Sequence, residues 1–147
     1  MLQLTKMSDY AVALLAQLAR EPEQAQSARQ AALAAGLPEP TVKKLLKELA
    51  HARLVVSERG AGGGYRLGRS PRSIRIAEIV ESLEGQLALT RCSAHPQPCG
   101  QFGTCRTRPG WFRVNDALRR ALGRFTLADM LADGSPPPGA RIHDHPV

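Results

Sequence analysis

Residues 40–67 of the chain read PTVKKLLKELAHARLVVSERGAGGGYRL, and the fold can be inferred from this stretch. Apolar residues at spacings of three and four predict a helix from residue 41 to about residue 51, with Pro40 at its first position. The β-rich run 54–59, a glycine-rich loop and the short run 65–67 then predict a hairpin. The stretch therefore predicts a helix followed directly by a two-stranded hairpin.

Two helical patterns precede this stretch. The first begins at Ser8 and closes before Pro22, and the second opens at a capping box formed by Ser27 and Gln30 and ends at Gly36. Two short helices joined by a glycine-containing turn are typical of a helix-turn-helix, although an ordinary helical hairpin with a solvated lysine face shows the same pattern. The hairpin that follows favours a winged helix. The glycine-rich loop lacks the Gly-Lys-Ser/Thr ending of a nucleotide-phosphate loop.

Basic residues are concentrated in this segment. The chain carries a net charge of +7, and residues 40–75 alone hold nine lysines or arginines against two glutamates, an excess of the same size. That concentration favours double-stranded DNA as the partner, with the third helix in the major groove and the wing at the phosphate backbone or minor groove. The residues expected to contact DNA are Thr41, Lys43, Lys44, Lys47, Arg59, Gly60, Gly62, Gly63 and Arg66.

All three cysteines, Cys92, Cys99 and Cys105, lie in a loop of turn-forming and small residues. Three thiolates that can bend toward one point suit an iron–sulfur cluster or a zinc ion. An odd number of cysteines without a secretory signal indicates reduced thiols and a cytoplasmic protein. The apolar runs are too short to span a membrane.

The remaining pattern is helical. Residues 74–85 predict a fourth helix, and a later stripe recurs at helical spacing through Trp111, Val114, Leu118, Leu122 and Phe125. This stripe lies outside the winged-helix unit, so a second copy of the chain is its expected partner, although a long helix can also pack on its own domain. Thr126 begins a last short helix.

The expected class is therefore mainly α with a small β-hairpin wing: a winged helix-turn-helix plus a long dimerisation helix. The expected division is a DNA-binding domain (1–90), a cysteine loop (91–108), a dimerisation helix with a short C-terminal helix (109–133) and a disordered tail (134–147).

Five segments carry a family resemblance: 4–12, the wing at 59–67, the run 74–81, the three cysteines, and 125–130. Together they resemble the iron–sulfur-dependent winged-helix regulators of the IscR/NsrR type over residues 1 to about 131. Within that group, residues 87–95 and the pair Trp111 and Asn115 look most like the regulator of the SUF iron–sulfur assembly genes. The resemblance implies a homodimeric repressor that binds a DNA operator and takes no small-molecule substrate. It also implies a [2Fe-2S] or [4Fe-4S] cluster held by Cys92, Cys99 and Cys105.

The fourth cluster ligand is where the chain departs from one branch of the family. Arg108 stands where IscR-like proteins place a histidine. NsrR-like proteins can borrow an aspartate from the first helix of the partner, which makes Asp9 the favoured candidate and His95 a second one. Asp9 can equally stabilise the first turn of its own helix.

Three functions compete at this point. They are a cluster-sensing repressor of SUF genes, a nitric-oxide sensor on the same fold, and a DNA-binding dimer with a structural zinc. An enzyme is not expected, because no Ser, His or Asp falls in a nucleophile-elbow or paired-carboxylate context.

Overall fold

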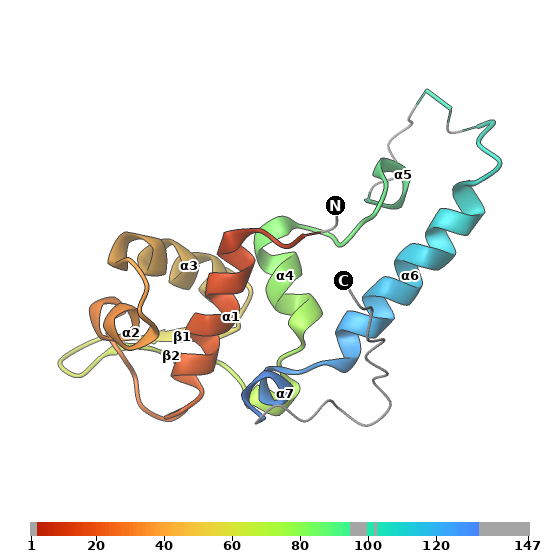
Figure 1. Ribbon diagram of the computed structural model, residues 1–147. Coiled ribbons are helices and arrows are strands. Elements are labelled where there is room, and N and C mark those ends of the chain that lie inside the picture. Colours follow the sequence, from red (N-terminus) through yellow and green to blue (C-terminus); the bar gives the residue numbers. More distant parts are fainter. Residues whose placement is uncertain (1–2, 95–99, 102, 133–147) are drawn as a thin grey trace, which may run out of the picture.

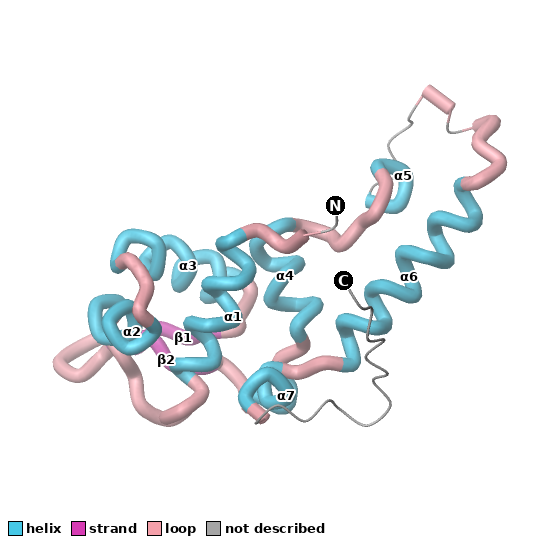
Figure 2. The backbone as a smooth tube through the Cα atoms, in the orientation of Figure 1, coloured by secondary structure: helices cyan, strands magenta, loops and turns pink. Residues whose placement is uncertain are grey.

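The computed structural model describes residues 3–94, 100–101 and 103–132. It confirms a mainly helical chain with a two-stranded antiparallel hairpin. Figures 1 and 2 show a body formed around α1 (Lys6–Leu18), from which α6 (Arg108–Arg124) projects with the short α5 (Arg91–Ala94) beside it. The expected tail, 134–147, lies outside the described residues.

The helix-turn-helix consists of α2 (Ala28–Ala35) and α3 (Glu39–His51). The capping box predicted from Ser27 and Gln30 is present, and Gly36 ends α2 in the left-handed conformation at φ 66°. The helix α3 begins at Glu39, two residues before the predicted start, because Pro38 takes the N-cap position and Pro40 is tolerated in the first turn.

The wing is formed by β1 (Val55–Glu58) and β2 (Gly64–Leu67), which pair antiparallel with Val55 opposite Leu67. The free edge of β2 is covered by one residue from before α2: Gln26 and Tyr65 exchange backbone hydrogen bonds of 2.9 and 2.7 Å. Gly64 allows this close approach, because a Cβ there would lie 2.4 Å from the backbone carbonyl of Gln26. The strand β2 therefore anchors the wing to the start of the helix-turn-helix.

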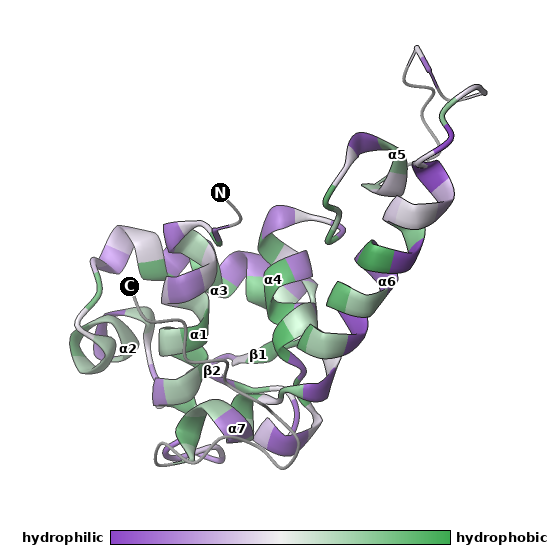
Figure 3. Ribbon diagram, turned by 45° about the vertical axis from the view of Figure 1, so that its right-hand side comes forward, coloured by the Kyte–Doolittle hydropathy of each residue, from purple (hydrophilic) through white to green (hydrophobic). Residues whose placement is uncertain are grey.

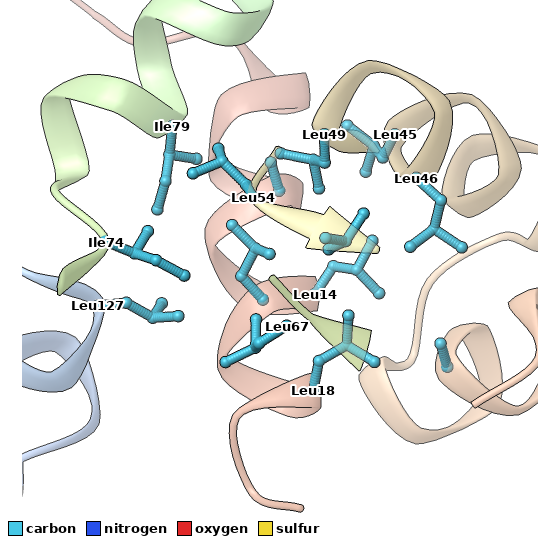
Figure 4. Packing of buried hydrophobic residues seen from close by; sticks show 14 of the residues in the cluster. Leu14, Leu18, Leu45, Leu46, Leu49, Leu54, Leu67, Ile74, Ile79 and Leu127 are labelled. Atoms are coloured by element: carbon cyan, nitrogen blue, oxygen red, sulfur yellow. The ribbon is translucent and has the colours of Figure 1, made fainter. Parts of the chain in front are cut away.

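One hydrophobic core joins these elements. Leucines of α1 and α3 meet Leu54 and Leu67 from the hairpin region and Ile79 from α4 (Ile76–Glu84), as Figure 4 shows. Leu127 of α7 (Leu127–Leu131) is also fully buried in this core. The last described helix therefore packs on the body around α1 rather than on the projecting α6.

The chain returns to the body through a short antiparallel contact. Ile76 N–H donates to the Phe125 carbonyl at 2.9 Å, and Leu127 N–H donates to the Ile74 carbonyl at 2.8 Å. Ile74 and Arg75 are extended here, so the fourth helix begins two residues later than predicted. Phe125 ends α6 as its C-cap and packs against the core of its own chain.

The N-terminus of α1 is fastened to the C-terminus of α4. A single carboxylate oxygen of Glu84 accepts a hydrogen bond from Thr5 N–H at 2.9 Å and another from the Ser8 hydroxyl. These two hydrogen bonds, that of Ser8 being the stronger influence, hold the pKa of Glu84 below its ordinary value. Because Thr5 is itself the N-cap of α1, Glu84 holds the helix at its first turn.

The close approach at Gly64 leads to a stability prediction. Replacing Gly64 with Ala should lower the free energy of unfolding by at least about 2 kcal/mol, because the backbone is at φ 155° and the methyl would collide with Gln26. Urea denaturation measures this change. Gly123→Ala is the control, since nothing lies within 4 Å of a Cβ there and alanine favours a helix, so it should not destabilise. Equal stability of the two variants would contradict the argument.

The Glu84 contact leads to a pH prediction. A carboxyl whose folded pKa is depressed stabilises the fold above its unfolded pKa, and this stabilisation is lost as the pH falls through the folded pKa. Glu84→Gln should therefore lower the free energy of unfolding at pH 7 by up to about 1 kcal/mol, a value that allows for solvent screening.

Urea denaturation from pH 7 downward should show that the difference in unfolding free energy between wild type and Glu84→Gln shrinks below the ordinary glutamate pKa of 4.5. Glu48→Gln is the control, since the Glu48 side chain makes no hydrogen bond or ion pair with other described residues. A difference in unfolding free energy between wild type and Glu84→Gln that does not change with pH would rule out this linkage.

Candidate nucleic-acid interface and cysteine loop

The helix α3 presents a basic face to solvent. Val42, Leu45, Leu46 and Leu49 are buried against the core, which leaves Lys43, Lys44 and Lys47 exposed. Lys43 pairs with Glu39 one turn earlier at 2.8 Å, and this hydrogen bond and charge lower the pKa of Glu39. Thr41 is half-buried in the first turn of the helix.

The three lysines differ in what holds them. Within the part of the chain that the structure describes, the side chains of Lys44 and Lys47 make no hydrogen bond or ion pair. Their charges are therefore available to a polyanion. Lys43 can bind a polyanion only by breaking its ion pair with Glu39 or by contacting both partners at once.

The two wing arginines predicted to contact DNA also differ in whether they are paired within the protein. Arg66 pairs with Glu58 across the hairpin, which raises the pKa of the guanidinium, and it also donates to the Leu67 carbonyl at 3.3 Å. Arg59 follows β1, is exposed, and has no hydrogen bond or ion pair among the described residues. Arg59 is therefore the wing cation that can reach a phosphate without breaking a contact inside the protein.

The wing glycines are required for different local reasons. Gly60 and Gly62 have φ of 102° and 81° with open space around them, so they shape the tip and leave it free of side chains. A Cβ on Gly63 would lie 2.4 Å from the Glu58 carbonyl oxygen. Gly63 is therefore required by the packing of the turn itself.

The two ends of the cysteine loop lie on neighbouring elements, since α5 packs against α6. Cys92 is in α5, half-buried, with its sulfur 3.2 Å from the Thr90 hydroxyl. Cys105 precedes α6, also half-buried, with its sulfur 3.4 Å from the Thr107 hydroxyl. Cys99 and His95 lie outside the described residues, and the described residues alone bring no three metal-binding side chains together.

The chemistry of Cys105 suits metal ligation. Hydrogen bonds from the Thr107 hydroxyl and backbone lower the pKa of the Cys105 thiol, and the backbone and charge of Arg108 add to the effect. A lowered pKa favours the thiolate, which is the form that binds iron and zinc. The described end of the donor set therefore fits a sulfur-ligated metal group.

Asp9 is exposed in the first turn of α1, held there by the contact of Thr5 and Ser8 with Glu84. The same neighbourhood contains a mainly apolar hollow of about 310 Å³. Its lining includes Leu4 just ahead of α1, Leu87 and Leu89 of the segment before α5, and Leu118 and Leu122 of α6. The start of α1 therefore lies beside the C-terminal half of α6.

The predicted apolar stripe of α6 is divided between two environments. Leu118 and Leu122 are half-buried in the hollow, whereas Trp111 and Val114 are 42% and 49% exposed. Phe112 adds a further exposed apolar side chain, and Figure 3 shows hydrophobic segments lying among hydrophilic ones along the helix. The N-terminal half of α6 thus leaves apolar surface uncovered in the single chain.

Sequence reasoning did not predict the contacts of the polar residues that join these parts. Asn115 is 5% exposed, and its amide holds the backbone at Leu87 and Leu89. Glu81 and Glu84 of α4 hold α6 and α1 respectively. A signal did exist for Asn115, because it is a polar residue beside the apolar stripe of a predicted helix.

Comparison with known proteins places this geometry in a family. Residues 4–133 match the model of the Rrf2 family, described as "Iron-dependent Transcriptional regulator". The chain is 32% identical over 135 residues to Protein rrf2 of Nitratidesulfovibrio vulgaris (91% of this chain, 90% of that protein). It is 33% identical over 134 residues to the HTH-type transcriptional regulator NsrR of Geobacillus kaustophilus (90% and 91%).

Solved structures agree. IscR of T. potens superposes with a TM-score of 0.68 at 33% identity, covering 95% of this chain and 93% of that one. CymR, the global cysteine regulator of B. subtilis, superposes with a TM-score of 0.68 at 30% identity, covering 89% and 97%. None of the helices in the described ranges is long and apolar enough to cross a membrane. The chain belongs to the Rrf2 family of transcriptional regulators, and it is a DNA-binding regulator rather than an enzyme.

Proposed function

We propose that this protein is a homodimeric repressor that senses iron–sulfur cluster status through Cys92, Cys99 and Cys105 and controls iron–sulfur (SUF) assembly genes. The observation that carries the proposal is the position of the cysteine loop. Its first cysteine is on α5 and its last one precedes α6, the helix whose other end returns to the DNA-binding body. A change in this loop therefore acts on the element that orients the winged helix.

The surface of α6 supports a symmetric dimer through this helix. Each α6 carries exposed Trp111, Phe112 and Val114 in one half and the Leu118–Leu122 hollow in the other. If two copies cross antiparallel about a two-fold axis, the exposed half of one helix meets the hollow of the other. Burying large apolar side chains in this way would stabilise the dimer by about 1.5–3 kcal/mol for each one fully covered.

The same crossing supports Asp9 of the partner subunit as the fourth ligand. The start of α1 lies beside the C-terminal half of α6 within one chain. An antiparallel α6 pair brings the partner's α6 N-terminus, which follows Cys105, to that place. Asp9, exposed in the first turn of α1, is then near the loop of the other subunit. Arg108 cannot substitute for a histidine ligand because a guanidinium stays protonated.

The mechanism links the loop to DNA through geometry. When bound, the cluster would join the three thiolates by metal–sulfur bonds that oxidation, nitric oxide or iron shortage removes. Lys44, Lys47 and Thr41 of each α3 would enter the major groove, and Arg59 would reach the minor groove or backbone. Half-sites lie about 34 Å apart, so a small reorientation of the two bodies changes how well both fit.

A nitric-oxide-sensing repressor is the second candidate, favoured by the 33% identity to a protein named NsrR. It uses the same fold and ligands and differs in target genes. Operator binding distinguishes the two: preferential binding upstream of iron–sulfur assembly genes supports the first function, and binding confined to other promoters supports the second. A structural zinc would leave the purified protein colourless.

The cluster proposal predicts the properties of the purified protein. Anaerobic wild-type protein should absorb visible light and contain iron and sulfide, because thiolate-ligated clusters are coloured and zinc is not. Cys105→Ala should lose most of both, and its affinity for the DNA upstream of its own operon should equal that of the metal-free wild type. Arg106→Ala, next to Cys105 but without a thiol, is the control. A colourless wild-type protein with stoichiometric zinc would refute the proposal.

The wing geometry predicts a DNA-binding effect. Arg59→Ala should weaken operator binding about tenfold at physiological salt, because an unpaired cation at the wing is removed. Fluorescence anisotropy against a salt series measures the affinity and its salt dependence. Arg120→Ala on α6, where the arginine already pairs with Asp116, should leave affinity unchanged. Unchanged affinity of the Arg59 variant would remove this residue from the interface.

A further inference from the structure

Three backbone groups just before the cysteine loop are held by side chains from two different helices. Leu87 N–H donates to Glu81 of α4 at 3.4 Å, and the Leu87 carbonyl accepts from the Asn115 side chain of α6 at 3.1 Å. Leu89 N–H donates to the other side of the same amide at 3.0 Å. Asn115 thus satisfies one donor and one acceptor, as a strand partner would.

This contact is protected from water. Asn115 is 5% exposed, one of few polar side chains that are buried among the described residues. Removing its amide would leave a backbone N–H and a carbonyl without their partners in a half-buried place, which costs more than a solvated hydrogen bond. Glu81 adds a second link, since the same carboxylate oxygen that accepts from Leu87 N–H also forms an ion pair with Arg119 of α6 at 3.2 Å.

The held segment leads to Cys92 with little freedom in between. Thr90 N–H donates to the buried Ser93 hydroxyl at 3.2 Å, and the Thr90 carbonyl accepts from Ser93 N–H at 3.0 Å. The Thr90 hydroxyl lies 3.2 Å from the Cys92 sulfur. The backbone from Leu87 to Cys92 is therefore held by successive contacts, and two of these are made by the Asn115 amide.

The other end of the loop belongs to the same helix. Cys105 lies three residues before Arg108, where α6 begins, and Asn115 is two turns further along. Asn115 therefore joins the two arms of the cysteine loop: one arm through its hydrogen bonds and the other through the helix on which it stands.

We propose that Asn115 is a positioning residue for the cysteine loop, which holds Cys92 at a set distance from the arm that carries Cys105. The inference rests on the proposed function, in which these cysteines bind a cluster. It is distinct from a role in merely docking α6 on the body, since Ile74, Arg75 and Glu81 already tie α6 and its C-terminal end to the body.

The test uses the full-length protein with two variants and one control. Asn115→Leu replaces the amide with an apolar side chain of similar size and so removes both hydrogen bonds. Asn115→Ala removes both hydrogen bonds and most of the side chain. Asp116→Ala is the matched control, because Asp116 is next to Asn115 on α6 and its side chain pairs with Arg120 of the same helix. Denaturation curves establish that all three are folded.

Two measurements follow. The first is the loss of visible absorption on exposure to air, which should be about tenfold faster in both Asn115 variants and within about twofold of wild type in Asp116→Ala. The second is hydrogen exchange of the Leu89 amide in metal-free protein, which should become at least tenfold faster in the Asn115 variants alone.

The outcomes separate the two proposals. Wild-type rates for cluster loss in Asn115→Leu, or equal acceleration in Asp116→Ala, would overturn the positioning role while leaving the cluster itself established. A wild-type protein that binds no iron would overturn the proposed function and this inference with it. Faster cluster loss together with faster Leu89 exchange, confined to the Asn115 variants, would support the inference.

Discussion

The structure depends on the two-sided packing of α4. Ile79 and Val80 are fully buried in the core shared with the helix-turn-helix, so one face of this helix is part of the DNA-binding body. Glu81 and Glu84 lie outside that core and hold α6, the segment before α5 and the start of α1. Burial fixes the position of α4, and its two carboxylates then hold these three neighbouring segments in place beside the candidate sensor.

The two ends of α6 are constrained differently. Its C-terminal end is held by the antiparallel contact of residues 74–76 with 125–127 and by the buried Leu127. Its N-terminal end carries exposed Trp111 and Val114 and follows the cysteine loop. Under the proposed function, a partner subunit or a metal centre at the exposed end of α6 would change the orientation of the winged helix at the anchored end.

Local signals predicted the DNA-binding half well. The capping box at Ser27, the left-handed Gly36 and the spacing of leucines in α3 are interactions among residues close in sequence, so the pattern contains nearly all the information. The polar contacts could not be found in this way. Asn115 meets residues 26 and 28 positions away, and Glu84 meets residues 76 and 79 positions away, and no periodicity encodes such pairs.

The sequence by itself determined the winged-helix class, the basic recognition face and the position of the three thiols, because hydrophobic period, caps and residue chemistry are local properties. Only the tertiary structure decided which cations are available and which are paired: Arg66 is held by Glu58, whereas the Arg59 side chain has no hydrogen bond or ion pair within the described residues. It alone placed Leu127 in the core and Asn115 against the backbone before Cys92. Such contacts join residues that are far apart in the sequence. They form only after the helices have packed together, because the arrangement of the helices determines which residues meet.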